Sequence, residues 1–347
     1  MPADPTTDDK TLRADLVLSG GGVKFIGLVG AIVALMDAGY SIERVSGVSG
    51  GSVVGAILAA AAQGDQLTAA EIRELALSVP LPKWRDARPI PLLGPAWGFL
   101  RDTGLYRGDF AHDWIRGELA NLGVRTWGDL KYSGDSVLAE RRYRAVVSVT
   151  DLTTGQLVRL PWDYQQVYGL DPDEQPVADA VRASMAVPFF FRPATLTSAG
   201  GIKSILVDGG VLSNFPIDSF DRRDGREPLW PTFGITVVPE LTRGVTGILP
   251  ALKPLRRYGE PLMLERLLTT MMVGHDRAHM SQPWVSVRTI EVHSADIDVL
   301  DFDASPARLE RLYDSGHAAA SKFLETWDWP GYLEHFRRSH YPDASGD

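Results

Sequence analysis

Cysteine is absent from this sequence, which excludes a disulfide framework, thiolate metal sites and thiol catalysis. Basic residues are in deficit, because 35 Lys and Arg stand against 44 Asp and Glu and leave a net charge of −9. That charge argues against a general nucleic-acid-binding protein. Long apolar runs are missing too: the longest, residues 53–62, has about half of the roughly 20 residues that a membrane-spanning helix needs. The polar, acidic start of the chain has no apolar signal segment. We therefore expect a cytoplasmic protein with peripheral contact at a membrane.

The sequence does contain an alternation of strand and helix patterns. Runs rich in Val and Ile predict strands at 15–18, 42–46, 143–152, 204–210 and 232–238. Apolar periodicity predicts helices at 25–38, at 52–62, after the capping-box pair Thr68 and Glu71, and after Ser305. This alternation predicts an α/β fold with a mainly parallel sheet that helices cover on both faces.

No linker divides the chain convincingly, so residues 12–330 are predicted to form one domain. The polar ends, 1–11 and 341–347, are expected to be disordered. Two segments break the alternation and are interpreted as cap-like insertions. Residues 79–108 are rich in proline, glycine and tryptophan, and residues 242–280 mix apolar with basic residues.

The first candidate site is the turn in DLVLSGGGVKFIGLVGAI. Gly20, Gly21, Gly22 and Lys24 lie between an apolar strand and an apolar helix, so backbone N–H groups are expected to face an anionic group. The third glycine of a dinucleotide fingerprint is replaced by Phe25, and the Gly-Lys-Ser/Thr of a P-loop is missing. Taken alone, the turn leaves open both an anion-binding loop and an ordinary tight turn.

The second candidate site lies in ERVSGVSGGSVVGAILAAA. Gly47, Ser49 and Gly51 form a G-x-S-x-G nucleophile elbow, with Gly50 beside the serine, between a strand and a helix. Small neighbours let the strand and helix approach, and the hydroxyl lies at a helix N-terminus that favours negative charge. The alternative is an ordinary Gly/Ser-rich turn.

A serine nucleophile needs a base, and SILVDGGVLSNFPI offers Asp208 at the end of a strand, followed by Gly209 and Gly210. The carboxyl end of a sheet strand is where α/β active sites form, although Asp-Gly is also common in hairpin turns. Seven histidines are present, none in a diagnostic loop. His275 and His279 have helical spacing but no third ligand, so no metal site is predicted.

In this order, the three motifs resemble the patatin-like phospholipase family, from about residue 16 to residue 238. The resemblance implies a three-layer αβα patatin-like fold and a Ser-Asp dyad. Asp208 would accept the proton of Ser49 without a histidine. The loop of Gly20–Gly22, with Gly50, would bind the oxyanion before an acyl-enzyme forms. No cofactor or metal is implied.

Two further stretches bear on this resemblance. RASMAVPFFFRP is similar to the family segment before the aspartate, and Ser184 and Pro188 are interpreted as shaping the loop beside the site. Phe25 departs from the family, which usually has glycine directly after the basic residue. Its ring is expected to narrow the acyl pocket or to pack beneath the loop. Lys24, at the family's basic position, is expected to steady the loop or to favour an anionic head group.

The resemblance implies a lipid acyl hydrolase of the phospholipase A type that acts on a membrane lipid or another acyl ester. A catalytically weak member that binds lipid or a partner is one alternative, which Phe25 favours. A Ser-His-Asp esterase of small soluble esters is another, and it needs a histidine near Ser49.

Two segments are predicted to dock on a membrane, and a cap packed on its own core is the alternative for both. The first joins aromatic and apolar side chains to basic ones: Trp84, Trp97, Phe99 and Leu100 with Lys83, Arg85 and Arg101. The second, residues 249–272, interleaves Leu, Met and Ile with Lys253, Arg256, Arg257 and Arg266.

Overall fold

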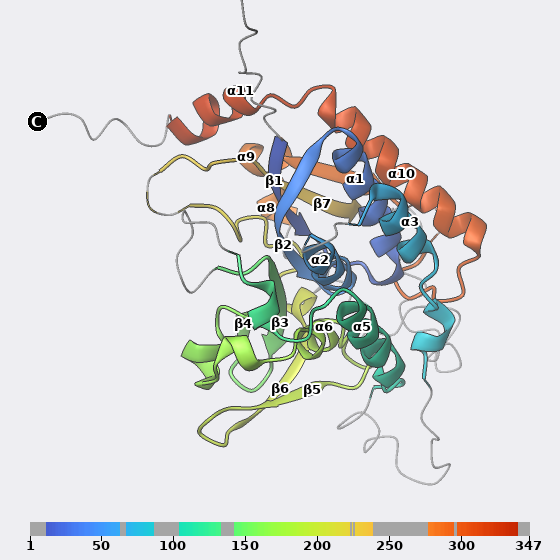
Figure 1. Ribbon diagram of the computed structural model, residues 1–347, viewed down its shortest axis with the longest axis vertical. Coiled ribbons are helices and arrows are strands. Elements are labelled where there is room, and N and C mark those ends of the chain that lie inside the picture. The colour runs from blue at the N-terminus through green and yellow to red at the C-terminus, as the bar shows by residue number, and fades with distance from the viewer. Residues whose placement is uncertain are drawn as a thin grey trace, which may run out of the picture.

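The computed structural model of this chain is shown in Figure 1. It describes residues 12–62, 67–86, 104–132, 142–222, 224, 226–238, 277–294 and 297–338. The predicted ends 1–11 and 341–347 lie outside these residues, and the extent of a single domain over 12–330 stays a prediction.

The described strands form one mixed, mostly parallel sheet. The parallel strands are β1 (Leu12–Leu18), β2 (Tyr40–Val48), β3 (Ala145–Asp151), β7 (Thr232–Val238) and β8 (Thr289–His293). The antiparallel strands are β4 (Gln156–Leu160), β5 (Ala194–Thr197) and β6 (Lys203–Asp208). The order is β5-β6-β3-β2-β1-β7-β8, and β4 pairs with β3 outside this path.

Helices form the layers on the sheet. The larger ones are α1 (Phe25–Asp37), α2 (Gly50–Ala61), α3 (Ala69–Leu77), α5 (Asp109–Asn121), α6 (Val177–Ser184) and α10 (Pro306–Leu324). The shorter ones are α8 (Arg277–Met280), α9 (Pro283–Ser286) and α11 (Trp329–Leu333). Helices α1, α3 and α10 lie side by side, and α2 packs on β2 and β3 beside them (Figure 1).

The strand period of two divides the core between the two faces of the sheet. On β1, Leu16 and Leu18 join the larger core beneath α1 and α2, whereas Val17 points to the opposite face. There it packs with Phe215 and Val285, the latter from α9. Both faces are therefore covered, and the predicted α/β class is confirmed.

The predicted elements agree with the structure where the local signal was strong. The Thr68–Glu71 capping box is present at α3, and α10 begins at Pro306 after its N-cap, Ser305. The sequence analysis did not identify β4, β5, β8, α5 or α6. It also did not foresee that β6 runs antiparallel to β3.

The predicted insertion at 79–108 is described at 79–86 and 104–108 only. Trp84 is 2% exposed, and its ring packs on Phe25, Trp114 and Phe302. Its assignment to a membrane-docking surface is therefore wrong, because the side chain lies in the core. Two other parts of that prediction lie outside the described residues. They are Trp97, Phe99, Leu100 and Arg101 in the first segment, and 249–272 in the second.

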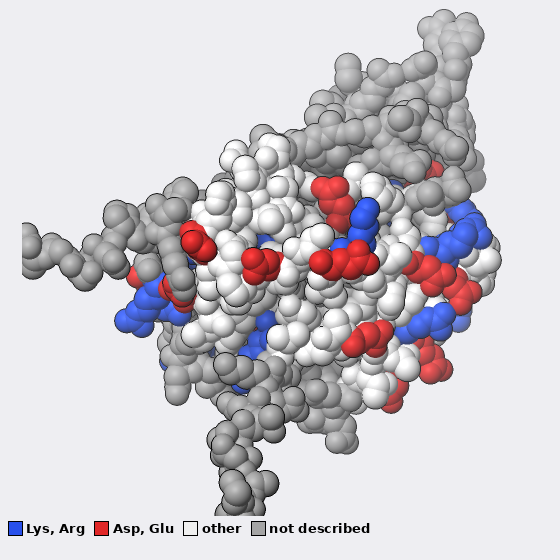
Figure 2. Space-filling view, turned by 90° about the horizontal axis from the view of Figure 1, so that it is seen from above, with Lys and Arg blue, Asp and Glu red and all other residues white. Residues whose placement is uncertain are grey.

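The described surface carries charges of both signs. On the face in Figure 2, acidic and basic side chains lie close to one another, and broad areas between them carry neither. Among the described residues, no helix combines the length and the apolarity that crossing a bilayer requires.

Candidate active site

Ser49 is the single residue between the end of β2 and the start of α2, and its backbone has φ 52° and ψ −125°. A positive φ at a residue with a side chain is strained, and such strain is typical of functional sites. A Cβ at Gly47 would lie 2.4 Å from the Gly51 carbonyl oxygen, and one at Gly51 would lie 2.5 Å from that of Ser19. Glycine is therefore required at both positions for strand and helix to meet in the elbow.

Asp208 is the last residue of β6, at the same level of the sheet as Ser49. Val48 pairs with Ser148 on one side of β3, and Asp208 pairs with Val149 on the other. The sequence analysis expected Asp208 at the carboxyl end of a sheet strand, and it is the last residue of β6. The antiparallel pairing of β6 with β3, which the sequence analysis did not foresee, brings this end of the strand to the elbow.

The carboxyl group of Asp208 is fully buried and has no ion-pair partner among the described residues. Burial raises its pKa to about 7, and the Ser49 side chain and the Gly210 N–H oppose that rise. Oδ1 accepts a hydrogen bond from the Gly210 N–H at 2.8 Å, whereas Oδ2 accepts none. One oxygen is thus held by the backbone, and the other remains available to a hydroxyl group. A general base is most effective when its pKa lies near the working pH.

The glycine loop packs directly against the elbow. A Cβ at Gly20 would lie 3.1 Å from the Cβ of Ser49 and 2.2 Å from Oδ1 of Asn214. The Gly20 N–H already donates to the Asn214 carbonyl at 3.1 Å. Gly20 was predicted as part of the oxyanion loop, and the geometry assigns it close packing rather than a free donor.

The next residues of the loop have backbone N–H groups that other backbone groups of the described residues do not accept. Gly22 has φ +55°, and a Cβ there would lie 1.9 Å from the Val299 carbonyl oxygen. A Cβ at Gly50 would lie 2.5 Å from the Gly22 carbonyl oxygen, so the loop and the start of α2 touch. Within the described chain, the N–H groups of Gly21, Gly22 and Gly50 donate to no backbone carbonyl. These three N–H groups are therefore the candidates for binding an anionic group beside Ser49.

Lys24 and Phe25 follow the glycines and anchor the end of the loop in the core. Lys24 is buried, and its ammonium group donates to the Ser294 hydroxyl at 2.8 Å, which anchors the loop to the segment after β8. Phe25 has helical dihedrals, φ −55° and ψ −22°, so its Cβ causes no strain. Its ring is buried and stacks on Trp84 at 6.2 Å between centroids.

Ser184, at the end of α6, connects the elbow to the sheet. Its hydroxyl accepts a hydrogen bond from the Ser49 N–H at 2.9 Å and donates one to the Ser148 carbonyl at 2.8 Å. The sequence analysis expected Ser184 to shape the loop beside the site. Ser148 was missed, because nothing in a Val-rich strand marks which carbonyl serves the active site.

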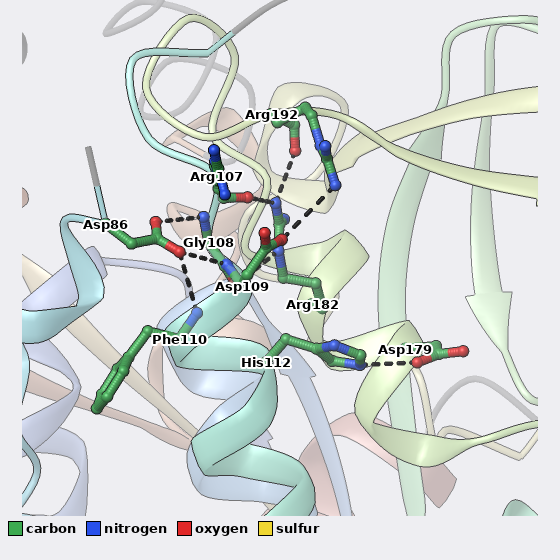
Figure 3. A network of polar contacts seen from close by, with 9 residues as sticks. All are labelled: Asp86, Arg107, Gly108, Asp109, Phe110, His112, Asp179, Arg182 and Arg192. Atoms are coloured by element: carbon green, nitrogen blue, oxygen red, sulfur yellow. Dashed lines mark hydrogen bonds and ion pairs between the residues drawn. The ribbon is translucent and has the colours of Figure 1, made fainter. Parts of the chain in front are cut away.

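Helix α6 is itself held by the polar network in Figure 3. The buried guanidinium group of Arg182 donates to the carbonyl oxygens of Arg107, Gly108 and Arg192. Asp86 accepts the N–H groups at the start of α5, at 2.6 Å from Gly108 N and 2.7 Å from Asp109 N. The network ties the start of α5 to α6, two residues before Ser184.

The described histidines lend no support to a Ser-His-Asp triad. His112 pairs with Asp179 at 2.8 Å and His317 with Asp37 at 3.4 Å. No hydrogen bond joins a histidine of the described residues to Ser49 or Asp208, and those residues contain no cluster of potential metal ligands.

Comparisons with known proteins concern the family and the fold. The model of the family described as "Patatin-like phospholipase" matches residues 16–221. The uncharacterized protein YqhO of Bacillus subtilis (strain 168) is 34% identical over 319 residues, which cover 91% of this chain and 99% of YqhO. The lysophospholipase nte1 of Aspergillus niger is 28% identical over 211 residues, which cover 58% of this chain and only 11% of that protein. The crystal structure of VipD from Legionella pneumophila has a TM-score of 0.50 at 18% identity, over 90% of this chain and 67% of VipD, and this likeness supports the fold.

Proposed function

Because this chain belongs to the patatin-like phospholipase family, we propose that it is a lipid acyl hydrolase in which Ser49 and Asp208 form the catalytic dyad. Family membership confirms the resemblance drawn from the three motifs and supports a lipid hydrolase. One observation carries the assignment of the residues. A strained serine lies beside a buried carboxyl group with a pKa of about 7 and one oxygen without a hydrogen bond.

In the proposed mechanism, Oδ2 of Asp208 accepts the proton of the Ser49 hydroxyl as the oxygen attacks the ester carbonyl. The N–H groups of Gly21, Gly22 and Gly50 stabilise the oxyanion, and one such donor typically contributes about 2.7–4 kcal/mol to transition-state binding. Asp208 returns the proton to the leaving alcohol, which produces an acyl-enzyme. It then takes a proton from water, which attacks the acyl-enzyme, and it passes this proton to the oxygen of Ser49 as the C–O bond breaks and the acid leaves.

The proposed substrates are acyl esters of membrane lipids, reached by peripheral contact of the protein with the bilayer. The name of the Aspergillus niger relative, a lysophospholipase, supports a lysophospholipid or phospholipid ester. Since the match covers about a tenth of that protein, the likeness concerns that part of it alone.

The test is labelling by a fluorophosphonate probe, which reacts with activated serines. We expect a single labelled residue, Ser49, and labelling slowed by roughly 10³-fold or more in Asp208→Asn, since the hydroxyl loses its base. Ser46→Ala is the matched control. Ser46 is a buried serine on the same strand whose hydroxyl donates to Ser219, and its loss should leave labelling intact.

Two results would change the assignment. Undiminished labelling in Asp208→Asn, together with its loss on replacement of one histidine, would place the protein among Ser-His-Asp esterases. A folded protein with no labelled serine and no ester hydrolysis would be a lipid- or partner-binding member of the family.

The proposed base also predicts a pH profile. Asp208 must be deprotonated to act, so the labelling rate should fall about tenfold per pH unit below a pKa near 7 and level off above it. A rate that stays constant down to pH 5 would show that the base titrates like an ordinary exposed carboxylate.

A further inference from the structure

A groove apart from the dyad lies between α5, α6 and the strands β4, β5 and β6. Its volume is about 780 Å³, within the range of roughly 300–1,000 Å³ that is typical of small-molecule sites. Neither Ser49 nor Asp208 lines it. Its apolar wall includes Leu196 of β5 and Leu206 of β6, whose side chains share one face of the sheet because Leu196 pairs with Ser204. The groove can therefore hold a ligand with an apolar part.

Most of the charged side chains of the groove lie where the start of α5 meets α6 and the segment before β5 (Figure 3). The two acidic residues, Asp109 and Asp179, are outnumbered by Arg182, Arg192 and Lys203. Arg192 lies 3.6 Å from Asp109, which is too long for a hydrogen bond, and Lys203 has no ion-pair partner among the described residues. With histidine counted as neutral, the lining carries one positive charge in excess, and two of its cations have unused hydrogen-bond donors.

Arg182 is the strongest indication that the groove takes an anion. It is 9% exposed, and its Nε and Nη2 donate to backbone carbonyls, whereas Nη1 is buried and has no acceptor among the described residues. Burial, and then the charge of Arg192, lowers the pKa of Arg182 to about 10, although Asp109 and Asp86 oppose this. A buried cation with an unused donor is costly. A carboxylate that binds both guanidinium groups offsets that cost through charge-assisted hydrogen bonds.

We infer that this groove binds a fatty carboxylate, with the carboxylate at Arg182 and Arg192 and the alkyl chain along Leu196 and Leu206. The apolar wall removes the chain from water, and the cations select the head. A carboxylate has one negative charge, which matches the excess positive charge of the lining, whereas a phosphate monoester has roughly 1.5 to 2 at neutral pH. Since the dyad does not line the groove, this ligand is separate from the ester that Ser49 attacks, and the inference does not depend on the proposed function.

The test is a calorimetric titration of the full chain with decanoate. Arg192→Gln should weaken binding by about tenfold or more, as expected for loss of a hydrogen bond to a charged group. Arg116→Gln is the matched control, because Arg116 is also an exposed arginine that pairs with an aspartate of α5, but it lies outside the groove. This control should bind decanoate like the parent. Ala194→Phe narrows the groove from β5 and keeps every charge, and it should weaken binding as well.

Three further ligands separate the parts of the interaction. Acetate has the head alone and decanol the chain alone, so each should bind at least about tenfold more weakly than decanoate. Decyl phosphate should also bind more weakly, because its second charge has no counterpart in the lining. Tighter binding of decyl phosphate would show a site for a phosphate head group and would overturn the carboxylate.

Two results overturn the site itself. If the parent, Arg192→Gln and Ala194→Phe bind decanoate equally, and fluorophosphonate labelling of Ser49 abolishes that binding, decanoate occupies the dyad and the groove is wrong. Acetate bound as tightly as decanoate would reduce the groove to a site for small anions. None of these titrations involves turnover. Failure of the groove therefore leaves the proposed hydrolase standing, and a Ser49 that no probe labels leaves the groove standing.

Discussion

Two aspartates of this protein, Asp208 and Asp221, are both largely buried, but their pKa values are shifted in opposite directions. Burial raises the pKa of Asp208 to about 7, since no cation of the described residues is paired with it and the Ser49 side chain and one N–H group alone oppose the rise there. Burial also acts on Asp221, but the guanidinium groups of Arg288 and Arg337 outweigh it and lower that pKa. Arg288 binds the carboxylate of Asp221 through two hydrogen bonds, at 2.7 Å and 2.8 Å.

The difference in pKa separates a carboxylate that joins two parts of the fold from one that can accept a proton. Asp221 joins the start of β8 to the C-terminal turn through Arg337, and a carboxylate held by two cations is a poor proton acceptor. Asp208 has no such partner among the described residues, so it accepts a proton near neutral pH but is costly to keep charged in the interior. Ionisable groups buried without compensation are concentrated at functional sites for this reason.

The most direct test of the contrast between the two aspartates is to replace each with the neutral asparagine in turn. Asp221→Asn should destabilise the protein by about 3–5 kcal/mol at pH 8, because it leaves the buried Arg288 without its counter-charge. Asp208→Asn should leave stability unchanged or raise it at the same pH. Urea unfolding measures both, and equal losses in the two variants would contradict the contrast between the sites.

The pH dependence of stability sharpens the same contrast. The folded-state pKa of Asp208, about 7, lies above its ordinary value of 3.8, so the folded protein holds this proton more tightly between those pH values. Stability should therefore fall as pH rises through this window, by up to about 1.4 kcal/mol per pH unit and roughly 4 kcal/mol in all. Asp208→Asn lacks this contribution, whereas the other carboxyl groups titrate in both proteins. The difference in unfolding free energy between the two proteins should change across pH 4–7, and a constant difference would show that the pKa of Asp208 is near its ordinary value.

The sequence predicted those parts of the fold that short-range signals encode. The Thr68 capping box, the apolar helix after Gly22 and the elbow at Ser49 each depend on residues close together in the chain. The direction of β6 depends instead on a pairing with β3 between residues 55 to 59 positions apart, which no local pattern records. Strands such as β5, with only four residues, carry too weak a signal to be identified.

The same distinction applies to the candidate site. Motif spacing was sufficient to name Ser49 and Asp208 as candidates, because each lies at the end of its own strand and precedes glycines. It could not show that the Gly20 N–H donates to the Asn214 carbonyl, whereas those of Gly21 and Gly22 donate to no backbone carbonyl of the described residues. Nor did it show that Trp84 is buried beneath Phe25, since an aromatic residue among prolines and basic residues looks the same on a surface as in a core.

The contrast between the aspartates also implies that hydrogen bonds around the elbow offset the strain of Ser49 and the burial of Asp208. Ser184→Ala tests this with the smallest expected effect. It leaves the Ser49 N–H and the Ser148 carbonyl without their partner, which should cost about 1–3 kcal/mol of stability. Because the lost bond holds the backbone of the nucleophile, fluorophosphonate labelling should slow as well. Ser46→Ala, which removes a buried hydroxyl paired with Ser219, should cost a similar amount and leave labelling unchanged. If both variants lose stability and both label at the parent rate, Ser184 supports the fold alone, and the elbow keeps its strained geometry without it.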